Sequence, residues 1–156
     1  MRSHLILFTA SIALSWAAAA TAQQRDEDNR VTKVEITFAT TGDGKDGNTQ
    51  VKDRVFLDGQ DYATLECCSS GNSGGDVWNA GNTSTRPMSL AKPMTKAQMR
   101  KAQIEFGMRP NGNDKWELRP TLRVTYEYGP ADQWTFDQFY LAADNVFTSR
   151  TFSIPH

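Results

Sequence analysis

The sequence predicts an all-β fold, a two-sheet antiparallel β-sandwich of about eight strands of the jelly-roll type, preceded by a cleaved signal peptide. Short segments in which apolar and polar residues alternate recur from residue 31 to the end of the chain. Clusters of Gly, Pro, Asn and Asp separate them, as expected for strands joined by turns. This spacing, with almost no helical pattern, favours a sandwich, and a closed barrel is the alternative.

The N-terminus has the composition of a secretory signal peptide over residues 1–22. Arg2 gives a basic start, residues 5–20 are almost wholly apolar, and small residues lead up to Gln23. The apolar run is too short to favour a transmembrane helix. We therefore expect a secreted or periplasmic protein with no transmembrane segment in its mature chain, and a retained N-terminal anchor is the alternative.

The rest of the chain divides into a leader and one domain. Residues 23–30 are polar and charged without apolar periodicity, so a flexible leader is expected there. Residues 31–156 have the length of a single domain, and their sequence contains no internal repeat and no interdomain linker. The expected organisation is thus a signal peptide, a leader and one β-sandwich.

Alternation of apolar residues places the strands. They are expected, in order, at residues 31–38, 51–57, 62–67, 87–90, 103–108, 116–128, 134–141 and 146–154. The first strand has Val34 and Ile36 on one face. The second has Val51 and Val55 on one face, but Asp53 falls on that same apolar face.

Three local features modify this pattern. Thr95 is a capping residue for one helical turn within 95–100, or else that segment leads directly into the next strand. Pro120 is expected to break the long strand region in the second half of the chain. The strand at 134–141 is expected to contain a bulge near Gln138.

Charge and histidine content argue against several functions. The formal net charge is −1 at pH 7, whereas nucleic-acid binders usually carry a basic excess. After signal removal His156, at the C-terminus, is the only histidine, which argues against Ser-His-Asp and Cys-His catalysis and against a His-rich zinc site. The spacing of Glu105, Glu117 and Glu127 singles out no catalytic pair. We expect no enzyme and no nucleic-acid partner.

The loop between the first two strands, residues 40–51, is the candidate site. Its glycines permit tight backbone bends, and Asp43, Asp46 and Asn48 supply side-chain oxygens, which suit a hard cation such as calcium. Further oxygens from Asn113 and Asp114 are expected at the same end of the sandwich. A plain solvated turn is the alternative, because turns favour the same residue types.

Two further features carry open alternatives. Cys67 and Cys68 are adjacent, and export favours oxidation, so they form a vicinal disulfide, remain two thiols or pair with another chain. Trp78 lies in a Ser-, Gly- and Asn-rich segment. It either anchors that segment on the core or stacks on a sugar as a ligand-binding residue.

Two segments resemble PLAT/LH2 (lipoxygenase-homology) domains. Residues 36–51 resemble the opening strand and acidic Gly-rich turn of that family, and residues 111–118 resemble its polar turn followed by Trp116. The resemblance implies an eight-stranded sandwich that often binds calcium at one end and engages membranes, lipids or proteins. Gly44 departs from it, since an acidic residue is frequent at that place in the family.

These observations predict a secreted, non-catalytic binding module, with calcium as an expected aid. Its partner is a lipid surface, a glycan or another protein. A secreted carbohydrate-binding or carbohydrate-active jelly roll is the first alternative. A cell-envelope interaction scaffold without a metal is the second.

Overall fold

The computed structural model describes residues 27–68 and 77–155. The expected signal peptide and residues 23–26 of the expected leader lie outside the described residues. The elements are β1 (Val31–Thr40), β2 (Gln50–Leu57), β3 (Gln60–Cys67), β4 (Thr83–Pro87), β5 (Ser89–Leu90), α2 (Lys96–Met99), β6 (Gln103–Arg109), β7 (Asn113–Tyr126), β8 (Asp132–Thr135), β9 (Phe139–Asp144) and β10 (Thr148–Ser153). No helix among the described residues has the length and apolar character needed to span a membrane.

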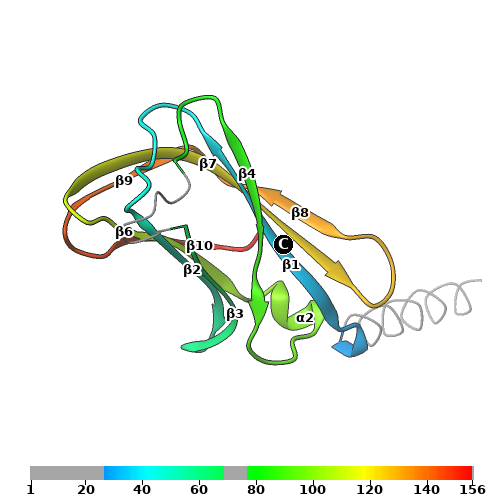
Figure 1. Ribbon diagram of the computed structural model, residues 1–156. Coiled ribbons are helices and arrows are strands. Elements are labelled where there is room, and N and C mark those ends of the chain that lie inside the picture. The colour runs from blue at the N-terminus through cyan, green and yellow to red at the C-terminus, as the bar shows by residue number, and fades with distance from the viewer. Residues whose placement is uncertain (1–26, 69–76, 156) are drawn as a thin grey trace, which may run out of the picture.

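The strands form two antiparallel five-stranded sheets, which confirms the all-β sandwich (Figure 1). The first sheet has the order β4-β1-β7-β8, and β9 also pairs with β7. The second sheet has the order β10-β6-β2-β3-β5. The prediction of about eight strands undercounts those in the described residues because two expected strands are each divided.

The first division carries the chain from one sheet to the other. β4 pairs with β1 in the first sheet, whereas β5 pairs with β3 in the second. Met88 lies between them, is buried, and donates its N–H to the carbonyl of Val34 at 2.9 Å. The edge strand expected at 87–90 is therefore a crossing point, in which Met88 fills the space between the layers.

The second division is a bulge along the edge of β7. Thr121 pairs with Thr135 in β8, and Leu118 pairs with Phe139 in β9. Between these pairs, three residues of the β8–β9 edge face two residues of β7, which is the geometry of a β-bulge. The bulge predicted near Gln138 is thus confirmed.

The break predicted at Pro120 is wrong, because β7 runs unbroken through it. The carbonyl of Pro120 accepts the N–H of Phe136 at 3.0 Å. A strand residue directs its N–H and C=O to the same side, so the missing proline N–H falls on the bulged edge. There it removes no hydrogen bond from the pairing with β1.

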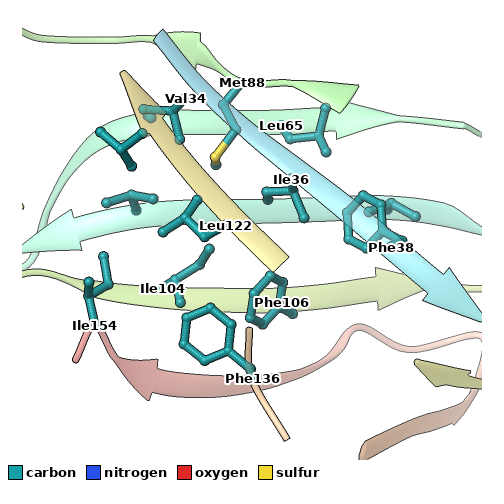
Figure 2. Close-up of a cluster of buried hydrophobic side chains, with 14 of the residues drawn as sticks. Val34, Ile36, Phe38, Leu65, Met88, Ile104, Phe106, Leu122, Phe136 and Ile154 are labelled. Atoms are coloured by element: carbon teal, nitrogen blue, oxygen red, sulfur yellow. The ribbon is translucent and has the colours of Figure 1, made fainter. Parts of the chain in front are cut away.

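The core lies between the two sheets and is built from the apolar faces predicted by alternation (Figure 2). In β7 every second residue from Asp114 to Tyr126 is buried. In β2 the buried face holds Val51 and Val55, and Asp53 lies among them as predicted. Phe106 and Phe136 meet edge-to-face at 5.3 Å between ring centroids.

Two polar side chains, Asn29 at the end of the expected leader and Thr95 at the start of α2, form hydrogen bonds at the end of the sandwich where β1 begins. Asn29 is buried, donates to the carbonyl of Tyr128 at 2.8 Å and accepts the Tyr128 N–H at 3.0 Å. The leader prediction is therefore wrong at its C-terminal end, where the side chain of Asn29 joins the start of β1 to the end of β7. Thr95 caps α2 in a capping box with Gln98, which confirms the helical turn.

Candidate functional site

The loop after β1, residues 41–49, is organised around the side chain of Lys45. Lys45 is fully buried. Its Nζ donates to the backbone carbonyls of Asp46 at 2.8 Å, Thr49 at 3.0 Å and Cys68 at 3.1 Å. The ammonium also lies 5.2 Å from the centre of the Trp78 ring, a cation–π distance. The carbonyl-rich loop does enclose a cation, and that cation belongs to the protein.

The backbone holds this arrangement in place. Lys45 and Trp78 form an antiparallel bridge in which each N–H donates to the other's carbonyl at 3.0 Å. A Cβ on Gly44 would lie 2.5 Å from the Trp78 carbonyl oxygen. Glycine is therefore required at residue 44 for the close approach.

The prediction that Trp78 stacks on a sugar is wrong in this structure. Its side chain is only 5 % exposed. Its ring stacks on Phe38 at 5.1 Å and lies 5.2 Å from Trp116. Trp78 belongs to the core, and it anchors its segment there as the alternative interpretation holds.

Asp114 joins the loop to the start of β7. Its carboxylate is buried, and one oxygen accepts from the hydroxyl of Thr49 and from the N–H of Asp46 at 3.2 Å. The other oxygen accepts the N–H of Lys115 at 2.8 Å. The prediction that residues 46 and 114 lie at one end of the sandwich is correct, and hydrogen bonds join them directly.

The other residues predicted as calcium ligands are dispersed. Asp43 is exposed and forms an ion pair with Lys115 at 2.8 Å. Asn48 donates to the carbonyl of Asn111 at 2.9 Å, and the side chain of Asn113 is exposed. Within residues 27–68 and 77–155, no three His, Cys, Asp or Glu side chains gather in a way that suits a metal.

The carbonyl oxygens of Asp46, Thr49 and Cys68 already accept from the Lys45 ammonium. These oxygens therefore do not fit an added calcium ion at the same point. Calcium at this end of the sandwich stays a prediction. The hydrogen bonds of the buried Lys45 support a structural role for the loop at residues 41–49. Cys67 and Cys68 are joined as a vicinal disulfide at the end of β3. Cys68 has a φ of 76°, a left-handed backbone that accompanies its hydrogen bond to Lys45.

A pocket of about 610 Å³ lies on the outer face of the second sheet. We call it the sheet-face pocket. Its lining residues are Gln50, Lys52, Asp53, Arg54, Asp61, Thr64, Leu65, Glu66, Glu105, Arg109 and Phe147. Most belong to β2, β3 and β6 and alternate with the buried residues of those strands, so their side chains face away from the core.

The backbone pairing of β2 with β6 is interrupted at Asp53, beneath this pocket. β2 and β6 pair at Val51↔Met108 and at Arg54↔Glu105, but the pairing is interrupted between these points. Oδ1 of Asp53 accepts the N–H of Gly107 at 2.9 Å in place of a backbone carbonyl. The other oxygen is buried and has no hydrogen-bond partner.

Burial raises the pKa of the Asp53 carboxyl well above its ordinary value. The hydrogen bond from Gly107 acts in the opposite direction, and the charge of Glu105 adds to the increase. Removing a carboxylate from water is the dominant effect, so burial favours the protonated form.

An ion-pair network crosses the pocket. The guanidinium of Arg54 contacts Glu105 through two nitrogens, at 2.7 and 2.8 Å, and Asp61 at 3.3 Å. The hydrogen bond to Glu105 is the largest influence that raises the pKa of Arg54. This pairing fixes the orientation of the Arg54 side chain across three strands.

One wall of the pocket is aromatic. The Phe147 side chain is 44 % exposed, and its ring lies over Gly107, where an added Cβ would come within 2.5 Å of the ring and 2.8 Å of the Lys52 carbonyl. The sequence signals for this pocket were Gly107 inside a strand and Asp53 on an apolar face. A strand glycine often marks a close approach, but it does not indicate a ligand.

Comparisons of the chain with protein-family models, with curated proteins and with solved structures found no match.

Replacing Lys45 by methionine tests the role of the ammonium. The variant Lys45→Met keeps a long apolar side chain beside Trp78 but leaves three carbonyls without this donor. We expect a loss of about 3 kcal/mol or more in the free energy of unfolding, measured by urea denaturation. The control Lys115→Met removes a lysine that is 52 % exposed and should leave stability nearly unchanged. Equal stability of the two variants would contradict the structural role of Lys45.

Replacing Asp53 by asparagine tests the protonated carboxyl. The unfolded chain loses this proton near its ordinary pKa, about 3.9, whereas the folded chain retains it to higher pH. The folded state then binds more protons, so the contribution of Asp53 to stability falls as pH rises through the raised pKa. Asp53→Asn retains the acceptor for Gly107 and does not titrate.

Urea denaturation from about pH 4 to pH 8 should therefore show the free energy of unfolding of Asp53→Asn increasing relative to that of the wild type as pH rises. The gain is about 1.4 kcal/mol per pH unit until the folded pKa is passed. A stability difference that does not vary with pH would show that the folded carboxyl has an ordinary pKa.

Proposed function

We propose that this protein is an exported, non-catalytic β-sandwich module that binds a glycan in the sheet-face pocket. The observation that carries the proposal is the pocket itself, with polar side chains from three adjacent strands and an aromatic wall. Its volume of about 610 Å³ lies within the usual range for small-molecule sites, about 300–1,000 Å³. Side chains positioned on a sheet are held more rigidly than those on loops.

The chemistry of the lining favours a glycan over a lipid surface. Sugars offer hydroxyl groups to polar side chains and an apolar ring face to an aromatic residue. Gln50, Thr64 and Glu66 provide the polar groups, and Phe147 provides the aromatic one. A membrane-binding surface instead needs a contiguous apolar patch, and Leu65 and Phe147 are the only large apolar residues in the lining.

The placement of the two central carboxyl groups supports binding without hydrolysis. Glycoside hydrolysis requires one carboxyl group to donate a proton and a second to act as nucleophile or base. Glu105 accepts from two nitrogens of the Arg54 guanidinium, so its carboxylate is already engaged inside the protein. Asp53, whose pKa is raised by burial, lies on the core-facing side of β2.

Export rests on the sequence pattern of residues 1–22, and the vicinal disulfide supports it, because disulfides persist in oxidising compartments. The resemblance to PLAT/LH2 domains is compatible with a module of this kind. Calcium is not required by the proposal. Its expected role is tested by measuring binding both in millimolar calcium and in chelator.

Glycan-array binding by the mature protein, followed by calorimetry with the best glycan, tests the proposed function. Phe147→Ala removes the aromatic wall and should weaken binding up to about tenfold, since an aromatic contact contributes about 0.5–1.5 kcal/mol beyond the area that it buries. Tyr128→Ala, which removes a side chain that is 68 % exposed and outside the pocket, should bind as the wild type does.

Melting curves of both variants show whether each is folded. Hydrolysis of the bound glycan would favour the carbohydrate-active alternative. Absence of glycan binding by the folded wild-type protein, in calcium and in chelator, would reject the proposal.

A further inference from the structure

The carboxylate groups of the sheet-face pocket already have hydrogen-bond donors. Glu105 and Asp61 accept from the guanidinium of Arg54. Glu66 accepts from Nε2 of Gln50 at 2.6 Å. A ligand that offered mainly donors would therefore have to compete with hydrogen bonds inside the protein.

Two cationic side chains of the pocket, Lys52 and Arg109, differ from these carboxylates because they form no ion pair with another described residue. Among the described residues, Lys52 and Arg109 form neither an ion pair nor a side-chain hydrogen bond. Both are exposed. They retain the capacity to donate to a ligand, and an arginine can bind a carboxylate through two parallel hydrogen bonds.

The strand register brings these cations to one place. Gln50 pairs with Arg109, and Lys52 lies two residues further along β2 on the same outward face. The same register sets Lys52 beside Gly107, whose missing side chain gives space to the Phe147 ring. The two cations therefore flank the aromatic wall of the pocket.

We propose that the sheet-face pocket binds a carboxylate-bearing saccharide, with Lys52 and Arg109 holding the carboxylate and Phe147 contacting the sugar ring. This inference rests on the proposed function and names its ligand class. The exposed ring of Phe147 favours a ligand that has an apolar face as well as a negative charge. A small inorganic anion has no such face.

The charge balance also selects a carboxylate over a phosphate. Besides the buried Asp53, three acidic side chains line the same pocket: Asp61, Glu66 and Glu105. A phosphate group carries between one and two negative charges at neutral pH, so these acidic groups would repel it more strongly than a singly charged carboxylate. The uronic acid class of sugars has the singly charged group attached directly to a pyranose ring.

Uronate oligomers and their methyl esters provide matched probes. Oligogalacturonate and oligoglucuronate of four units are each compared with the fully methyl-esterified form, which has the same length and hydroxyl groups but no charge. Calorimetry with the wild-type mature protein should show about tenfold or greater tighter binding of the acid form of at least one probe. The preference should decrease with added salt.

Variants locate the binding. Lys52→Gln and Arg109→Gln should each reduce the affinity for the acid form about tenfold and leave the weaker ester binding unchanged. Arg119→Gln makes the same charge change on β7, in the other sheet, and should have no effect. The comparison of acid and ester uses the wild-type protein, so it stands even if a variant fails to fold.

The outcomes separately test carboxylate recognition, saccharide recognition and the proposed function. Equal affinity for acid and ester would overturn the carboxylate inference while leaving glycan binding intact. Full competition by acetate or inorganic phosphate at concentrations matched to the oligomer would show an anion site without sugar recognition and would overturn the saccharide part. If neither form of either probe binds and the glycan array is also negative, the inference and the proposed function fail together.

Discussion

A single buried ammonium group holds one end of this protein together. Lys45 extends from the loop after β1 and donates to carbonyls of that loop and of Cys68 at the end of β3. An ammonium removed from water costs several kcal/mol unless hydrogen bonds compensate it. The loop therefore adopts the conformation that presents those carbonyls, and the Trp78 segment is fixed by its backbone bridge to Lys45.

A buried group of the opposite kind shapes the second sheet. Asp53 lies on the apolar face of β2 and occupies the place of a backbone acceptor for Gly107. Burial raises the pKa of its carboxyl group, and that group stands where a regular ladder would have a peptide group. Because the ladder is interrupted there and residue 107 has no side chain, the ring of Phe147 can lie close to the sheet. The pocket on the outer face follows from this local irregularity.

The fold was largely predictable because it depends on alternation. The buried faces of β1 and β2, the helix cap at Thr95 and the bulge near Gln138 all follow from patterns within a few residues. Pro120 was misjudged because its effect depends on which side of the strand lacks a donor. That side is set by the neighbouring strand and is not visible in the local sequence.

The candidate sites were harder to predict. Gly, Asp and Asn in residues 41–49 indicated a cation, but the role of Lys45 depends on contacts with Cys68 and Trp78, which are more than 20 residues away. The sheet-face pocket combines side chains from β2, β3 and β6, and only the register brings them together. Asp53 on an apolar face and Gly107 within a strand were visible irregularities, but neither carries information about a ligand.

NMR observation of the lysine side-chain ammonium groups tests the central claim most directly. A buried, hydrogen-bonded ammonium exchanges its protons with water slowly, whereas exposed lysines exchange fast. The structure predicts one slowly exchanging lysine signal in the folded protein, which is absent from Lys45→Met and retained in Lys115→Met. Fast exchange at every lysine of the folded protein would contradict a buried Lys45 and the organisation of the loop around it.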